Sequence, residues 1–94
     1  MSEDKKRDVH PIVKKALEIS YQGYDGIEFD DYAIEELQEM LKQYYGKPEL
    51  YNAIIDLINL AGVLDDRGSH SASMKLMIVV STAGDALKAL TEKK

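Results

Sequence analysis

The sequence contains no cysteine, no tryptophan, one phenylalanine and two prolines. The absence of cysteine excludes disulfide bonds, thiol chemistry and thiolate metal sites, which leaves hydrophobic burial as the main source of stability. Long apolar runs are also lacking. The longest, Leu76–Val80, is far too short to cross a bilayer, and the charged first seven residues do not resemble a signal peptide. We therefore expect a soluble, cytoplasmic protein without a membrane partner.

Groups that could carry catalysis are scarce. The only two histidines, His10 and His70, are far apart in the sequence, and no nucleophile has an obvious neighbouring base. The glycines form no phosphate-binding fingerprint. Four acidic residues lie close together in the sequence: Asp25, Glu28, Asp30 and Asp31. Their spacing does not match that of a calcium-binding loop, so helix capping is the better interpretation of this cluster. The sequence thus predicts a protein that is not an enzyme, with no catalytic residues, no cofactor and no metal.

The composition that remains is that of an ordinary small domain. The chain has 94 residues, of which 45% are hydrophobic and 31% charged, enough for one hydrophobic core. Charged residues dominate the start of the chain, where ordering is least expected. We predict a flexible N-terminal arm over residues 1–8 and a single domain over residues 9–94.

Apolar periodicity predicts three helices in the first two thirds of the chain. These run from residue 9 to about 21, from about 31 to 45 and from 48 to about 61. Between the first two, Gly23 and Gly26 bracket a turn, and the alternation in residues 27–29 indicates a very short strand. Asp30 is a candidate N-cap for the second helix, and Gly46 is a candidate stop after it.

The last third has a different character. Val63-Leu64 and the β-branched stretch 75–80 predict two strands of a hairpin, with the polar residues 65–73 as its long tip. The Gly/Ser/His stretch 67–73 is either a natural tip or a linker left by an expression vector. A last helix is expected from residue 81 or 82 to about 90. Both sides of strand 75–80 are apolar, so the last helix or a partner subunit must cover one of them.

The order of these elements resembles a winged helix-turn-helix domain. The stretches that carry the resemblance are Leu57–Leu64, similar to the end of a recognition helix entering a wing, and Ile78–Leu87, similar to the second wing strand and next helix of MarR-like or PadR-like regulators. The resemblance implies a mainly α fold with a small β-hairpin and a DNA-binding regulator, with helix 48–61 in the major groove and the wing, 63–80, against the backbone. A four-helix bundle remains the alternative, because residues 76–80 could also begin a long helix.

Under this resemblance, the candidate nucleic-acid contacts are Lys47, Asn52, Asn59, Arg67, His70 and Lys75. Charge argues against them. Residues 30–60 contain seven acidic side chains and only two lysines, so the expected reading unit carries the whole net charge of −5. Because nucleic-acid affinity depends on neutralising phosphates, an acidic reading unit would be repelled.

Aromatic composition favours a protein partner instead. Six tyrosines accompany the single phenylalanine, and tyrosine is enriched at protein interfaces. The candidate interface residues surround the helix-turn-helix corner or lie opposite the expected buried side of the third helix: Tyr44, Tyr45, Tyr51, Ile55 and Asp56. The sequence therefore predicts a small acidic module that binds another protein or a second copy of itself, with DNA-binding regulation as the alternative.

Overall fold

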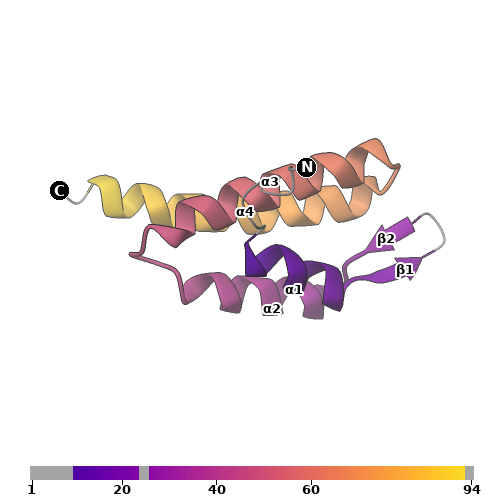
Figure 1. The fold of residues 1–94 in the computed structure, drawn as a ribbon, viewed down its shortest axis with the longest axis horizontal. Helices are drawn as coiled ribbons and strands as arrows, with labels where there is room; N and C mark the ends of the chain where they lie inside the picture. The colour runs from indigo at the N-terminus through magenta and orange to yellow at the C-terminus, as the bar shows by residue number, and fades with distance from the viewer. Residues whose placement is uncertain (1–9, 24–25, 93–94) are drawn as a thin grey trace, which may run out of the picture.

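The computed structural model of the chain describes residues 10–23 and 26–92; the predicted N-terminal arm, residues 1–8, lies outside this range. The described part is mainly α-helical, as the sequence predicted, and its one small antiparallel hairpin lies within residues 21–28 and not at the predicted position, residues 63–80 (Figure 1). Its elements are α1 (Pro11–Ile19), β1 (Tyr21–Gly23), β2 (Gly26–Glu28), α2 (Asp31–Lys42), α3 (Glu49–Asp66) and α4 (His70–Glu92).

Side-chain caps fix the starts of α1 and α2. The Nδ1 atom of His10 accepts a hydrogen bond from the backbone N–H of Ile12 at 3.1 Å, and Pro11 occupies the first turn, where a missing N–H costs nothing. At α2, the Oδ1 atom of Asp30 accepts from the backbone N–H of Ala33 at 2.8 Å. The prediction of Asp30 as an N-cap is confirmed.

The hairpin lies where the sequence placed a turn and a short strand. Residues 21–23 pair with residues 26–28, although only the second strand was predicted, since the first helix was expected to continue to about residue 21. Gly26 has φ of 123°, a conformation that favours glycine. The neighbouring Ile27 N–H donates to the Oγ of Ser69 at 3.1 Å, which ties the hairpin to the turn between α3 and α4.

The predicted wing over residues 63–80 is wrong. Val63 and Leu64 belong to α3, which continues to Asp66, and the stretch 75–80 belongs to α4, which begins at His70 instead of at residue 81 or 82. The physical reason is burial on one side of a helix. Residues at helical spacing lie in the core, and this packing overrides the β propensity of the stretch: Ala72, Leu76, Val79, Val80 and Ala83.

A glycine turn separates the two long helices. Gly68 has φ of 92°, its N–H donates to the carbonyl of Asp65, and the N–H of Ser69 donates to the carbonyl of Leu64 at 2.8 Å. This bond pair is the Schellman motif that ends many helices. Because Ser69 is buried and also binds the hairpin, the Gly/Ser/His stretch 67–73 is part of the packed fold.

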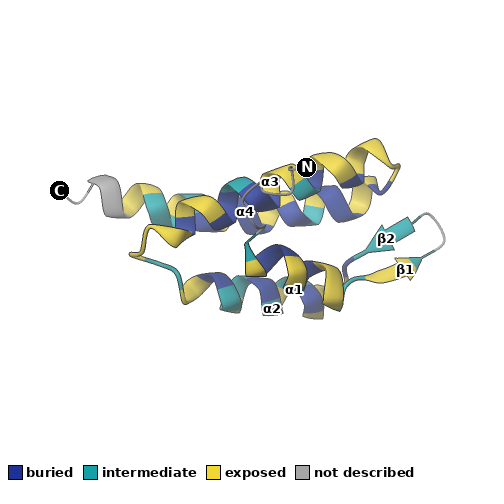
Figure 2. Cartoon of the chain, viewed as in Figure 1, coloured by how far each residue is buried: buried dark blue, intermediate teal, exposed yellow. Residues whose placement is uncertain are grey.

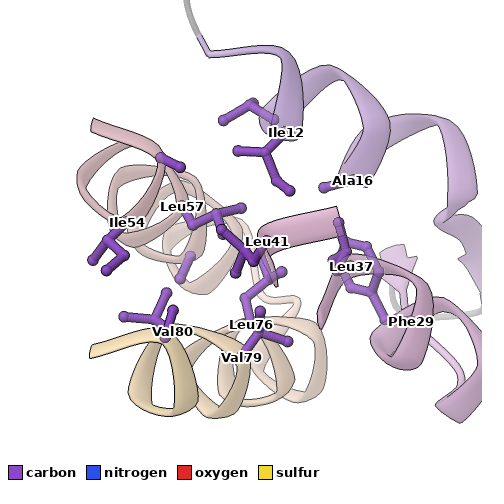
Figure 3. Packing of buried hydrophobic residues seen from close by; sticks show 14 of the residues in the cluster. Ile12, Ala16, Phe29, Leu37, Leu41, Ile54, Leu57, Leu76, Val79 and Val80 are labelled. Atoms are coloured by element: carbon purple, nitrogen blue, oxygen red, sulfur yellow. The ribbon is translucent and has the colours of Figure 1, made fainter. Parts of the chain in front are cut away.

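One hydrophobic core joins the four helices. α3 and α4 lie side by side as an antiparallel pair, α1 packs against α2 and α3, and α2 packs against α4 (Figure 1). Side chains from all four helices and from the loop before α2 meet at the centre (Figure 3). The largest fully buried ones are Phe29, Ile12, Leu37, Leu41, Leu50, Leu57, Leu64, Leu76 and Val79.

Candidate protein-interaction face

The predicted interface tyrosines have different surroundings. Tyr51 is 59% exposed on α3, and Ile55, one turn later, is half-buried on the same side of that helix. Tyr44 and Tyr45 follow α2 and pack partly against the core. The ring of Tyr44 meets His10 edge-on, with 4.8 Å between the ring centroids. Tyr51 and Ile55 are therefore open to a partner, whereas Tyr44 contacts the residue before α1 and Tyr45 packs partly against the core.

Asp56 faces into the molecule. It is only 4% exposed, and its Oδ2 atom accepts a hydrogen bond from the backbone N–H of His10 at 2.9 Å. This N–H precedes α1 and has no carbonyl within that helix to bind. Asp56 thus joins the start of α1 to the middle of α3 and is not available to a partner at the surface.

The predicted nucleic-acid contacts do not come together. Asn52 and Asn59 are exposed on one side of α3, but Lys47 and Arg67 lie beyond opposite ends of that helix, which its 18 residues make about 27 Å long. His70 pairs with the carboxylate of Asp65 at the turn between α3 and α4. The arrangement offers no continuous basic surface along α3.

Lys75 faces inward as well. Its Nζ atom donates to the backbone carbonyl of Phe29 at 2.7 Å, which links α4 to the loop before α2. The side chain is half-buried, and its charge is used within the fold.

We expect Lys75→Met to lower the free energy of unfolding by about 1–2 kcal/mol, because the Phe29 carbonyl loses a charged donor while the apolar stem is kept. Denaturant unfolding at fixed pH measures the change. Lys88→Met, on an exposed part of the same helix, is the matched control and should change stability by less than about 0.5 kcal/mol. Equal effects of the two substitutions would contradict a structural role for Lys75.

The sequence predicted only part of the most distinctive surface of the molecule. Ile58 follows Asp56 by two residues and Met77 follows Lys75 by two, so each points about 200° away from its inward-facing neighbour. Residues three or four positions away from Ile58 and from Met77 lie on the same sides of their helices. They form one stripe on α3 and one on α4, on the side away from α1 and α2. We call this surface the outer face: Tyr51, Ile55, Ile58 and Gly62 of α3, and Met74, Met77, Ser81 and Gly84 of α4.

The outer face combines exposed apolar area with an absence of charge. Met74 is 68% exposed, Met77 42% and Ile58 39%. Between Leu50 and Leu64 the only charged side chain is Asp56, and between Ser71 and Gly84 it is Lys75; both point inward. Figure 2 shows exposed residues along these two helices beside their buried inner sides. In a chain with 31% charged residues, two adjacent helix stretches whose outer sides are uncharged over 14 or 15 residues are typical of a binding surface.

The acidic side of α2 differs from the outer face. Tyr32, Glu35, Glu36 and Glu39 line a shallow, open hollow there. Glu36 pairs with Lys15 of α1 at 3.1 Å, and Glu39 pairs with Lys42 at 3.2 Å. These carboxylates form a solvated, salt-bridged surface.

Comparisons of the chain with protein-family models, curated proteins and solved structures found no match. Among residues 10–23 and 26–92, no three histidine or carboxylate side chains lie close enough to hold a metal ion. None of the helices in this part of the chain is both long and apolar enough to cross a membrane.

Proposed function

We propose that the chain is a small, non-catalytic interaction module that binds protein through the outer face. The observation that carries the proposal is the coincidence of exposed large apolar side chains with a lack of charge on the outer sides of residues 50–64 of α3 and 71–84 of α4. Protein interfaces are depleted of charged residues at their centres and enriched in tyrosine and methionine. Tyr51, Met74 and Met77 supply these residue types here.

For the architecture we favour the four-helix alternative over the winged helix. The four helices surround one core, and the hairpin lies between α1 and α2. Residues 63–80, which a wing would need, are helical or part of the α3–α4 turn. A four-helix arrangement also explains why Asp56, in the middle of α3, and Lys75, in the second turn of α4, point toward the first half of the chain.

DNA-binding regulation, the other function predicted from the sequence, gains no support from these surfaces. Its candidate contacts are spread over both ends of α3 and the interior, and the face that α3 presents between them is uncharged. Phosphate contacts require clustered positive charge. We therefore do not propose it.

Site-specific photo-crosslinking tests the proposed function. Ile58 is replaced by the photoreactive residue benzoylphenylalanine, and the variant is produced in the organism whose genome encodes the chain. Irradiation is expected to give a covalent adduct with another protein molecule, because Ile58 lies at the centre of the outer face. The same residue at Thr82, which is exposed on another side of α4, is the matched control and should give none. Absence of an adduct at Ile58, or equal adducts at both positions, would overturn the proposal.

A further inference from the structure

We propose that the outer face binds the outer face of a second copy of this chain, around a two-fold axis that runs parallel to α3 and α4. This inference rests on the proposed function and names its partner. It follows from the sizes of the side chains on the face, from two glycines that the single chain does not explain, and from the distribution of charge.

Large and small residues are paired across the face. Because α3 and α4 are antiparallel and joined by the short turn at residues 67–69, residues equally far from the turn lie level with one another. Large side chains therefore lie beside small ones at three of four levels. The level pairs, from the turn outward, are Gly62 with Met74, Ile58 with Met77, Ile55 with Ser81, and Tyr51 with Gly84.

A two-fold rotation converts this pattern into complementarity. With the axis parallel to the helices, α3 of one copy lies over α4 of the other at the same level. Tyr51 then covers Gly84 of the second copy, and Met74 covers Gly62 of the second copy. Each contact occurs twice, as an isologous interface requires. The large residues of one face fill the low points of the other, which is the packing that helix pairs adopt.

Gly62 and Gly84 support this arrangement independently. Both lie inside helices, where glycine destabilises the helix relative to alanine. Neither has the positive φ that requires glycine, and a Cβ at either position would meet nothing within 4 Å. Packing within one chain therefore gives no reason for a glycine. Close approach of a large side chain from a second copy gives a reason for both.

The area of the face is suitable for a dimer. Its two helices have 18 and 23 residues, which makes them about 27 Å and 34 Å long, and side by side they are about 20 Å wide. The uncharged face covers residues 51–62 and 74–84, about 17 Å of these lengths, so its flat projection is about 340 Å². It forms the centre of an interface that the flanking turns of both helices extend toward the roughly 800 Å² per partner of a standard interface.

Charge directs a second copy to the same face. The chain has a net charge of −5, and other surfaces, such as the exposed Glu35 and Glu39 of α2, repel a like-charged copy. The outer face carries no charge and meets no such repulsion. A strongly basic partner would find its complement on α2 and not on this face.

Sedimentation equilibrium of the purified full chain, from about 1 μM to 1 mM, tests the inference. We expect a reversible monomer–dimer equilibrium. Gly84→Leu should raise the dissociation constant at least tenfold, because Tyr51 of the second copy loses its space, yet it should not lower the melting temperature of the monomer, because leucine favours the helix. Thr82→Leu, off the face, is the matched control. Gly62→Leu repeats the test at the other contact.

A compensating pair identifies the contact itself. Tyr51→Ala combined with Gly84→Leu moves the large side chain from α3 to α4 and should restore dimerisation that Gly84→Leu alone removes. Failure to restore it would overturn the Tyr51–Gly84 pairing, and a dimer unaffected by Gly84→Leu would overturn the choice of face. A chain that is monomeric at every concentration would overturn self-association. In that case, an Ile58 adduct with a different protein would leave the proposed function intact, whereas no adduct would end both.

Discussion

Replacing Leu76 by alanine is expected to lower the free energy of unfolding by about 2–4 kcal/mol, because this leucine of α4 is fully buried in the core and its removal leaves a cavity. Ile78→Ala, two residues away, is expected to change it by less than about 0.5 kcal/mol, since Ile78 is 57% exposed. The large difference arises because a helix turns residues i and i+2 to opposite sides.

Denaturant unfolding followed by circular dichroism measures both values, at a concentration low enough that dimerisation does not contribute. In a strand, Leu76 and Ile78 would point to the same side and would have similar costs. Val79→Ala provides a second comparison, because Val79 is fully buried in α4 but would lie opposite Leu76 in a strand. Similar losses for Leu76 and Ile78 would contradict the helical assignment of residues 75–80.

The first half of the fold could be predicted because its signals are local. The ends of α1 and α2 depend on residues that act within one turn, such as the Asp30 cap and Pro11 in the first turn of α1. The turn between the first two helices followed from the spacing of Gly23 and Gly26, although the hairpin itself was expected at residues 63–80. Only the partner strand, residues 21–23, was not predicted, since three residues are too few for periodicity to separate a strand from the end of a helix.

The second half could not be predicted because its deciding interactions are distant in sequence. The stretch 76–80 has the composition of a strand, and the Gly/Ser residues before it indicate a loop. Its buried residues face α3 across the turn, and Ser69 binds the hairpin 42 residues earlier. The spacing of Ala72, Leu76, Val79 and Ala83 did contain the helical signal, but the Gly/Ser composition of residues 65–73 favoured a hairpin tip.

The candidate site was predictable where local helical spacing identifies the exposed side of a helix, and it was missed where the helix itself was not predicted. Ile55 was identified from its position opposite the buried side of α3 and Tyr51 as a tyrosine at the helix-turn-helix corner, and both belong to the outer face. Asp56 was included because helical projection cannot show that its side chain reaches the N–H of His10. The α4 half of the face was missed because Met74 and Met77 were assigned to a wing. Once α4 is a helix, its stripe follows from spacings of four and three residues.

The inward charges connect stability with function. Asp56, in the middle of α3, and Lys75, in the second turn of α4, each bind a backbone group of the first half of the chain. Their use within the fold leaves the opposite sides of α3 and α4 free of charge. The same two residues therefore attach α1 to α3 and the loop before α2 to α4, and they leave an uncharged surface for a partner.

The second large effect is expected at Asp56. Asp56→Ala should lower the free energy of unfolding by about 2–3 kcal/mol, because it removes the acceptor of the His10 N–H and leaves that group partly buried without its bond. Asp56→Asn keeps an oxygen acceptor but loses the charge and should cost less. Asp66→Ala, at the exposed C-terminal end of the same helix, is the control and should leave stability unchanged or slightly higher, since acidic groups are unfavourable there.

Amide hydrogen exchange separates a local from a global effect of Asp56. Because Asp56 holds the start of α1, its loss should speed exchange of the α1 amides, such as those of Val13 and Ala16, more than exchange at the centre of α3. The His10 cap still binds Ile12 in the variant, so α1 should remain helical while detaching more often. Uniform acceleration across all four helices would instead mean that Asp56 acts on the whole core, and unchanged exchange in α1 would contradict its role as the link between α1 and α3.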